Sequence, residues 1–461
     1  MPEALHFLSV QALRRAYQAG DLCPVEVTER MLERQQHLNP AVQAISYPLQ
    51  ALAREQAHDA KQRYQRGTAG PLAGIPVSIK DTFDIENHIT TYGSTAYRDN
   101  VARADSGSIR RLRAAGAVFI GKTHTAEFGQ SATSENHLGE PARNPWDLDR
   151  TPGGSSGGAA ASVAAGLATL ALGADGGGSI RIPAAFSGLV GIKPTYGLCR
   201  NEGGFRGMSD FVCPGPLAWR VADARDMLAV LADTPFPRRA LERPLRIAWC
   251  PRPEGRPVDP ALLAVVAQAV GRLSGMGHSV EEVALPLAGW NEAFGPLVLD
   301  EEIRERGHLL AGDLSQLTEY VRRSLEAARA QDPARVGEAR RQHAAYRERI
   351  AGLFATYDLI ATPTTATTAF PLGQRPREID GQRVDGLWGA FPFTAMFNVA
   401  GTPPMTLPCG FAGGLPVGLQ LVAAQHQDQR LLDLAEDLEQ ALALDSPARL
   451  PQQARDRATA S

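Results

Sequence analysis

Residues 153–183 hold the feature that most constrains this chain: two glycine-flanked serine sites on either side of one apolar segment. The first site reads Gly-Gly-Ser-Ser-Gly-Gly and contains Ser155, and the second reads Asp-Gly-Gly-Gly-Ser and ends at Ser179. No charged residue occurs in residues 151–174. A backbone so rich in glycine can adopt turns that are closed to other residues, and it leaves N–H groups uncovered. Uncovered N–H groups beside a hydroxyl are what acyl-transfer chemistry requires.

The rest of the chain alternates predicted helices with short apolar strands, which is typical of an α/β protein. We expect helices at 10–17, 25–38, 49–66, 108–115, 158–166, 221–232 and 430–444. We expect strands at 77–79, 117–122, 168–172, 188–192, 245–250, 357–364, 404–408 and 417–422. Residues 260–355 have a long, charged pattern typical of helices, and we expect this helical block to cover the mouth of a site. The sequence predicts one α/β domain over residues 1–447, with a mixed sheet flanked by helices, and a disordered tail at 448–461.

Charge and cysteine content narrow the class of partner. Lys and Arg number 47 against 50 Asp and Glu, a formal net charge of −3, so the charge balance does not favour nucleic acid or an anionic membrane as a ligand. The five cysteines are scattered and form no CxxC pair, which indicates neither a zinc cluster nor a disulfide framework.

Residues 1–14 lack the basic start followed by an apolar core that marks a targeting segment. Residues 157–174 are uncharged but short and rich in Ala and Gly, so a buried helix and strand is favoured over a membrane span. We expect a cytoplasmic protein.

Two interpretations use only part of the glycine-rich stretch. Residues 153–157 match the G-x-S-x-G turn of an α/β-hydrolase esterase, with Ser155 as nucleophile and a downstream histidine as base: His308, His343 or His426. That turn must follow a strand, and the residues before it read as a loop. The glycines could instead cradle a phosphate, but there is no G-x-x-x-x-G-K-[ST] sequence and residues 173–178 enter no clear helix.

Further motifs occur at fixed distances from the two serines. Ser179 lies 24 residues after Ser155, and the pair Lys80-Asp81 begins 75 residues before Ser155. Three more motifs accompany them: Asn-Pro-Trp at 144–146, Gly-Ile-Lys-Pro at 191–194 and Leu-Pro-Val-Gly-Leu-Gln at 415–420. Together these residues resemble the amidase signature family. The resemblance runs from about residue 9 to residue 444, and the combination is highly specific.

Carried over position by position, the resemblance implies a hydrolase that cleaves the C–N bond of a carboxylic amide through a serine acyl-enzyme. Ser179 would be the nucleophile, Ser155 a bridging serine after a cis Gly154–Ser155 peptide bond, and Lys80 the base. The substrate-binding positions would be Ser155 and Ser179 together with four glycines: Gly129, Gly176, Gly177 and Gly178. Asp175 and Arg181 are expected to hold the turn through hydrogen bonds. The resemblance implies no metal and no organic cofactor.

Elementary chemistry is consistent with these roles. Lysine is a base only when neutral, so its reference pKa of about 10.4 must fall. Uncharged, Ala- and Gly-rich surroundings disfavour the ammonium form and lower this pKa. Ser155 could then give a proton to Lys80 and take one from Ser179, and the reverse relay could protonate the departing amine. Backbone N–H groups of residues 176–179 would stabilise the tetrahedral oxyanion.

One branch of the family is the amidase component of a tRNA-dependent amidotransferase, which supplies ammonia to a partner. This chain has Ile182 where that branch has Gln, and Gly176 where it has Thr. These departures favour a free-standing hydrolase of a small amide, and a homodimer is compatible with the resemblance. The substrate is not identified, because five aromatic residues could either line an apolar pocket or pack in the core: Trp290, Phe294, Tyr320, Trp388 and Phe391.

Overall fold

A mixed sheet forms the centre of the protein, whose computed structural model describes residues 5–444. Within that range, eleven strands make up this sheet. From one edge to the other they are β1 (Ile45–Pro48), β3 (Val118–Thr123), β2 (Pro76–Lys80), β4 (Leu170–Asp175), β6 (Cys213–Ala218), β5 (Val190–Ile192), β12 (Pro404–Ala412), β13 (Leu415–Ala423), β9 (Leu359–Pro363), β7 (Arg246–Trp249) and β8 (Ser279–Glu282). β2 runs parallel to β3 and β4, and β7 runs parallel to β8 and β9, whereas the other neighbours are antiparallel. The predicted α/β class with a mixed sheet is confirmed.

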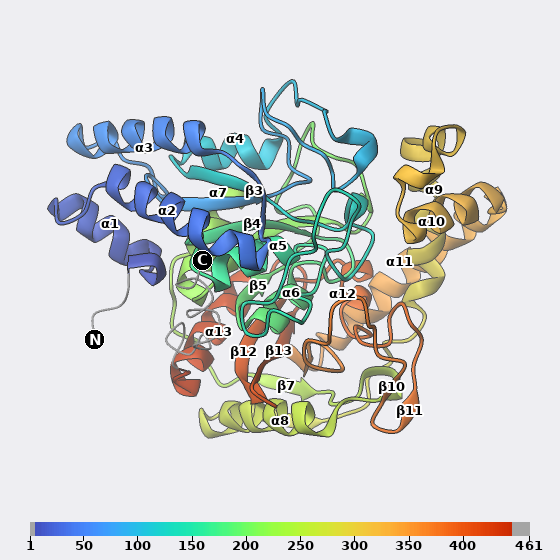
Figure 1. Ribbon diagram of the computed structural model, residues 1–461. Helices are drawn as coiled ribbons and strands as arrows, with labels where there is room; N and C mark the ends of the chain where they lie inside the picture. Colours follow the sequence, from blue (N-terminus) through green and yellow to red (C-terminus); the bar gives the residue numbers. More distant parts are fainter. Residues whose placement is uncertain (1–4, 445–461) are drawn as a thin grey trace.

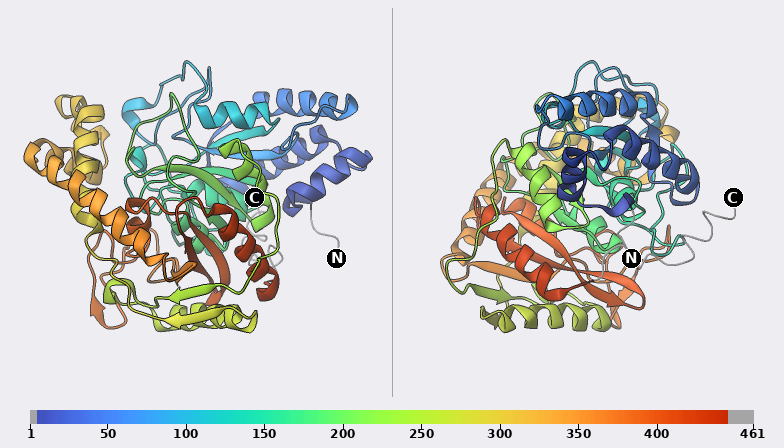
Figure 2. Two further views of the ribbon diagram at one scale, coloured as in Figure 1. Left: turned by 180° about the vertical axis from the view of Figure 1, so that it is seen from behind. Right: turned by 90° about the vertical axis from the view of Figure 1, so that its left-hand side faces the viewer.

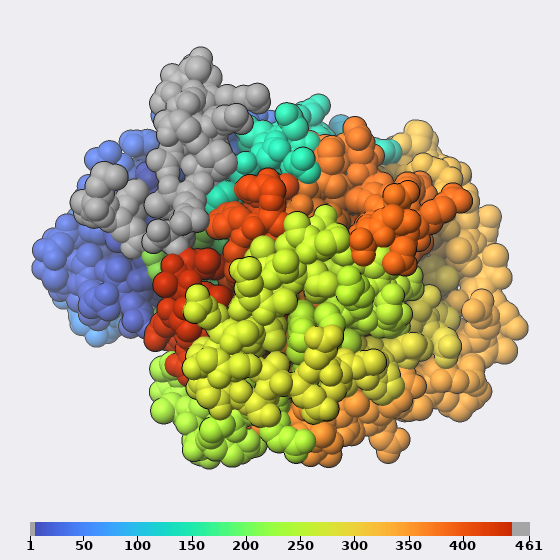
Figure 3. All heavy atoms as spheres, turned by 90° about the horizontal axis from the view of Figure 1, so that it is seen from below, coloured from blue at the N-terminus to red at the C-terminus, as the bar shows by residue number. Residues whose placement is uncertain are grey.

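Helices cover both faces of this sheet (Figure 1). One face carries α4 (Gly107–Ala114), α7 (Val221–Ala232), α8 (Pro260–Gly275) and α13 (Asp428–Leu442), with α1 (Val10–Ala19) packed on α7. The opposite face carries α5 (Gly157–Ala164) and α6 (Arg181–Ser187), while α2 (Pro24–Val42) and α3 (Gln50–Gln65) lie over β3. Helix α8 forms part of the surface of the molecule on the side shown in Figure 3.

Three long helices project together from one side of the molecule (Figures 1 and 2). They are α9 (Trp290–Arg306), α10 (Glu319–Ala330) and α11 (Pro333–Leu353), and α9 contacts both of the others. The short helix α12 (Ala395–Val399) joins α9 to the rest of the protein through a shared apolar cluster. A hairpin outside the sheet, β10 (Glu378–Ile379) with β11 (Gln382–Arg383), lies in the segment that precedes α12.

The helical block predicted at 260–355 is only partly correct. Strand β8 interrupts it and joins the edge of the sheet, because Ser279–Glu282 pairs in parallel with β7. Helix α8 packs on β12 and β13, so the helices that could form a cover are α9, α10 and α11. Strands β1 and β6 were not predicted. Strand β6 contains two prolines, which local propensity disfavours in a strand, yet it pairs with β4 along its whole length. The predicted tail at 448–461 lies outside the described residues.

The expectation that the second glycine run enters no helix is wrong. Residues 176–180 lead directly into α6, which begins at Arg181. Pro183 reads as a helix breaker in the sequence, but it stands in the first turn of α6. There its missing N–H removes no intrahelical hydrogen bond and its fixed φ suits the helix. This run therefore forms a strand–loop–helix connection between β4 and α6.

Candidate active site

Lys80 lies at the carboxyl end of β2, on the face that α5 covers. Strand side chains alternate between faces: Val77 and Ile79 enter the core beneath α7, whereas Ser78 contacts Ser162 of α5 with 2.8 Å between the hydroxyl oxygens. Lys80 consequently points towards the glycine-rich stretch. Its Nζ donates hydrogen bonds to Ser155 Oγ at 2.7 Å and to the Ala174 carbonyl at 3.2 Å.

The surroundings of Lys80 favour its neutral form. Its side chain is fully buried, and α5, which covers it, contains no charged residue and is buried throughout. This burial lowers the pKa of Lys80 from its usual value of 10.5 to about 7, against the opposing attraction of the Asp175 carboxylate. A primary amine with a pKa near neutrality can accept a proton at physiological pH.

Ser155 stands between the end of an irregular segment and the start of α5. The Gly154–Ser155 peptide bond is cis, as the resemblance implied. A side chain at Gly154 is excluded, because its Cβ would lie 2.5 Å from the carbonyl carbon of Thr133. The Ser155 carbonyl accepts hydrogen bonds from the hydroxyls of Thr125 (2.9 Å) and Ser134 (3.3 Å). These contacts fix the backbone that presents Ser155 Oγ to Lys80.

Ser179 lies in the loop between β4 and α6, on the same side of the sheet. Its carbonyl accepts a hydrogen bond from the Ser156 N–H at 3.1 Å, which joins the two glycine-rich runs. Among the described residues its hydroxyl has no hydrogen-bond partner. Ser179 is 8% exposed, against 1% for Ser155 and 2% for Lys80. The structure therefore brings the three predicted catalytic residues to one place, with Ser179 nearest to solvent.

Asp175 organises the loop that carries Ser179. Its carboxylate accepts hydrogen bonds from the N–H groups of Gly178 (2.7 Å) and Ile180 (3.2 Å), and from the guanidinium of Arg181 (2.8 and 2.9 Å). Burial alone would raise the pKa of Asp175, but the ion pair and hydrogen bonds with Arg181 and the hydrogen bond from Asn398 hold it well below its usual range. The predicted structural role of Asp175 and Arg181 is confirmed.

We expect Asp175→Asn to lower the free energy of unfolding by about 3–5 kcal/mol, because it leaves the buried Arg181 charge unpaired. Urea denaturation of the full chain measures this loss. The control is Asp59→Asn, which removes the exposed ion pair between Arg63 and Asp59 on α3 and should cost less than about 1 kcal/mol. Equal costs for the two variants would contradict the role assigned to Asp175.

The prediction that every N–H of residues 176–179 faces the oxyanion needs a correction. The Gly178 N–H already donates to Asp175, so it is not available to a substrate. The N–H groups of Gly176, Gly177 and Ser179 have no acceptor within residues 5–444. Gly129 lies beside the other serine, since a Cβ on Gly129 would be 3.4 Å from Ser155 Oγ.

Two of the five aromatic residues considered for a substrate pocket lie directly against these glycines. A Cβ on Gly177 would lie 3.2 Å from Trp388 and 3.3 Å from Phe294, and one on Gly176 would lie 2.6 Å from Met208 Sδ. Trp290 contacts Phe294 and Trp388 edge-on. The other two aromatic residues lie elsewhere: Tyr320 packs beside Phe128, and Phe391 packs with Phe186 and Phe370. The contact of Met208 with Gly176 was not predicted from the sequence, and no local sequence signal points to it.

None of the histidines proposed for an esterase site hydrogen-bonds to Ser155 within residues 5–444. Ser155 Oγ contacts Lys80 instead, and His343 contacts the Val399 carbonyl at 3.0 Å. Residues 148–153 form no strand, so the strand–turn–helix arrangement that the esterase interpretation requires is not present there.

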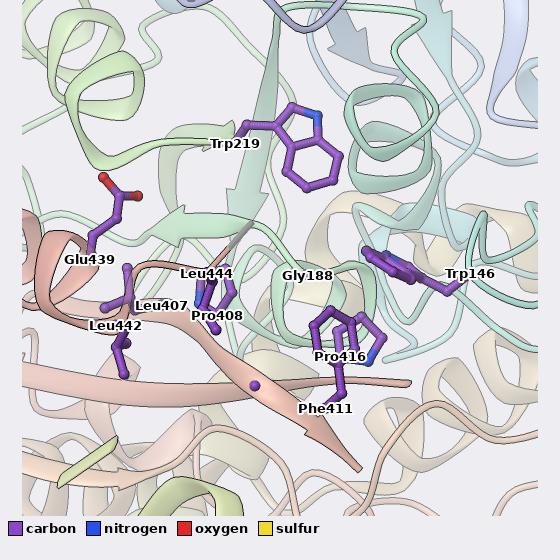
Figure 4. A pocket seen from close by; sticks show the side chains of 11 residues that line it. Trp146, Gly188, Trp219, Leu407, Pro408, Phe411, Pro416, Glu439, Leu442 and Leu444 are labelled. Carbon is purple, nitrogen blue, oxygen red and sulfur yellow. The ribbon is translucent and has the colours of Figure 1, made fainter. Parts of the chain in front are cut away.

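Figure 4 shows a separate apolar hollow of about 50 Å³. Trp146, Trp219 and Phe411 line it, together with the end of α13. None of its lining residues belongs to the candidate active site.

Within the described part of the chain, no group of three His, Cys, Asp or Glu side chains could hold a metal ion. No helix in residues 5–444 has the length and apolar character that crossing a membrane requires.

Comparison with known proteins assigns this arrangement to a family. The Amidase family model matches residues 26–432. The chain is 32% identical to an acylamidase of Rhodococcus erythropolis over 94% of this chain and 95% of that protein, and 34% identical to one component of the glutamyl-tRNA(Gln) amidotransferase of Moorella thermoacetica over 95% and 97%. The solved structure of a bacterial aryl acylamidase, an amidase signature enzyme, superposes with a TM-score of 0.87 at 25% identity, covering 100% of both chains. The chain therefore belongs to the amidase family, the amidase signature enzymes, and is a serine-dependent amide hydrolase.

Proposed function

We propose that this amidase works without a partner protein, with Ser179 as the nucleophile, Ser155 as the proton relay and Lys80 as the base. The observation that supports these catalytic roles most strongly is the 2.7 Å hydrogen bond between Lys80 Nζ and Ser155 Oγ in a buried, uncharged setting. Burial there lowers the pKa of Lys80 to about 7. The unpartnered hydroxyl of Ser179, with free N–H groups beside it, supports the remaining roles.

The proposed reaction begins when Ser155 gives its proton to neutral Lys80 and takes the proton of Ser179. Ser179 Oγ attacks the carbonyl carbon of the amide, and the N–H groups of Gly176, Gly177 and Ser179 stabilise the resulting oxyanion. The C–N bond then breaks, and the amine leaves with the proton that returns from Lys80 through Ser155. Water, deprotonated by the same relay, attacks the acyl-Ser179 ester, so the acid is released and Ser179 regains its proton.

The domain organisation is part of the same proposal. We infer a single amidase domain over residues 1–447, in which α9, α10 and α11 act as a cover for the site. Support comes from Phe294 of α9, which packs on Gly177, and from Glu127, which binds the start of α10. The Glu127 carboxylate accepts hydrogen bonds from the N–H and the hydroxyl of Thr318 at 2.7 and 2.6 Å. Glu127 itself lies two residues before Gly129, which adjoins Ser155.

Further predictions concern the setting of the enzyme. Its substrate is proposed to be a small-molecule amide, its location the cytoplasm and its assembly a homodimer. The five cysteines are free in the structure, which supports a reducing compartment. The other candidate function is ammonia supply to a partner, and the 34% identity to an amidotransferase component favours it.

The experiment that separates these functions uses the full chain purified alone. It is incubated with acetamide, hexanamide, benzamide and glutamine, and ammonia and carboxylic acid are both quantified. We expect ammonia and acid in equal amounts from the isolated chain, and none from Ser179→Ala. Ammonia release that appears only after the other components of an amidotransferase are added would contradict the proposal.

A further inference from the structure

Three side chains from distant parts of the sequence cover the glycines that precede Ser179. Met208 packs on Gly176, and Phe294 and Trp388 pack on Gly177, all within 3.3 Å of where a Cβ would stand. Met208 and Trp388 are only partly buried, so part of this apolar cover stays exposed. An acyl group attached to Ser179 would thus meet an apolar surface.

Aromatic contacts hold Trp388 in this position. Its ring meets Trp290 edge-on, with 5.4 Å between ring centroids and 80° between planes, and it meets Phe294 at 5.8 Å and 82°. Such pairs contribute attraction beyond their buried area. Both partners lie on α9, so the helix fixes the orientation of the indole.

Arg375 fastens the loop that carries Trp388 to the loop beside Ser155. Its guanidinium donates to the carbonyls of Gly386 and Leu387, both at 3.3 Å, and to the Thr133 hydroxyl at 3.0 Å. It also donates to the Ser131 hydroxyl. Thr133 in turn packs against Gly154. The two walls of the site are therefore joined by one side chain whose hydrogen bonds all go to uncharged acceptors.

We propose that Met208, Phe294 and Trp388 form the acyl-binding wall of this amidase, with Arg375 as the positioning residue that keeps Trp388 in place. The preferred substrates are then amides of uncharged, apolar acyl groups. The proposal rests on the function given above. A carboxylate or ammonium on the acyl group would lose water against these three side chains, none of which offers it a hydrogen-bond partner, and this loss is costly. Arg375 would bind a substrate carboxylate only weakly, because both of its terminal nitrogens already donate hydrogen bonds within the protein.

A carboxylate near this wall sharpens the choice of test substrates. Glu301 of α9 accepts a hydrogen bond from the Ser209 N–H at 2.7 Å, while its other oxygen is buried and has no partner within the described residues. An ammonium-bearing substrate could exploit that oxygen. The panel therefore contains acetamide, butyramide and hexanamide as an apolar series, with succinamate and glutamine as charged amides.

The test compares kcat/KM across this panel for the wild type, Trp388→Ala, Arg375→Ala and Arg383→Ala. Arg383 is an exposed arginine of the same loop and serves as the control. We expect kcat/KM of the wild type to rise about fourfold per added methylene, and hexanamide to exceed both charged amides by at least about 100-fold. Trp388→Ala and Arg375→Ala should flatten the apolar series through a KM that rises most for hexanamide, whereas Arg383→Ala should match the wild type.

A preference for glutamine or succinamate would overturn the inference and leave the proposed function intact. An equal loss on all substrates for Trp388→Ala would overturn the selective role of Trp388. Trp388→Phe keeps a ring against Trp290 and Phe294, and carries the same test with a smaller effect if the alanine variant does not fold. Failure to hydrolyse any amide would instead contradict the proposed function itself.

Discussion

Replacing Ser179 with alanine is expected to lower kcat/KM for any amide substrate by at least about 10⁴-fold. The variant keeps the N–H groups of the loop and the Lys80–Ser155 pair, but no atom remains to form the acyl-enzyme. Because the Ser179 hydroxyl has no hydrogen-bond partner among the described residues, the loss should come without a change in the melting temperature. Steady-state ammonia release and a thermal melt of the same preparation measure the two effects.

The matched control for this variant is Ser187→Ala, on the helix that follows Ser179. The Ser187 hydroxyl is buried and likewise has no partner among the described residues, but it belongs to no part of the proposed relay. Its removal should leave kcat/KM within about twofold of the wild type. A Ser179→Ala variant that retained more than about one-hundredth of the wild-type activity would show that another residue attacks the amide.

Replacing Lys80 with methionine is expected to lower kcat/KM by about 10³-fold or more, since general base catalysis is lost. In the wild type, kcat/KM should rise with pH through about 7 and then level off. Below that pH the neutral fraction of Lys80 falls tenfold per unit, because its pKa lies at about 7 in the folded protein. The Lys80→Arg variant should stay inactive across this range, since a guanidinium remains protonated. A pH profile with no break near neutrality would contradict the role of Lys80.

The same lysine is expected to reduce stability. Its pKa is about 7 in the folded state and near 10.4 in the unfolded chain, so between these values the unfolded chain binds more protons. The free energy of unfolding must then rise with pH across this window, while the full burial cost applies below it. At pH 7 that cost is about 4 kcal/mol. Lys80→Met removes it and loses two hydrogen bonds, so a net gain of about 2 kcal/mol is expected.

The residues proposed for the site could be picked out from the sequence because they belong to short local patterns, and the structure brings Lys80, Ser155 and Ser179 together. The glycine runs around Ser155 and Ser179, together with Lys80 at the end of an apolar strand, are motifs that each span only a few residues. Alternation along β2 decides which way Lys80 points, and that too is a local property. The cis bond before Ser155 and the ties between Asp175 and Arg181 followed from the resemblance, and the structure contains both.

Features that depend on tertiary packing were not predictable from the sequence. Strand β6 forms despite Pro214 and Pro216 because a long antiparallel partner and burial outweigh their poor strand propensity. The reorientation of the Gly178 N–H towards Asp175 depends on the geometry of one tight loop. Contacts such as Met208 on Gly176, or Arg375 on Thr133, join positions far apart in the chain, and no periodicity or spacing encodes them.

The central claim is that Ser179, and not Ser155, forms the acyl-enzyme, and covalent labelling tests it most directly. The full chain is treated with a serine-directed fluorophosphonate, digested and mapped by mass spectrometry of its peptides. The account predicts a single adduct on Ser179, slower labelling in Lys80→Met and no adduct in Ser179→Ala. An adduct on Ser155 in the wild type, or hydrolysis of amides that persists after complete labelling at Ser179, would contradict it.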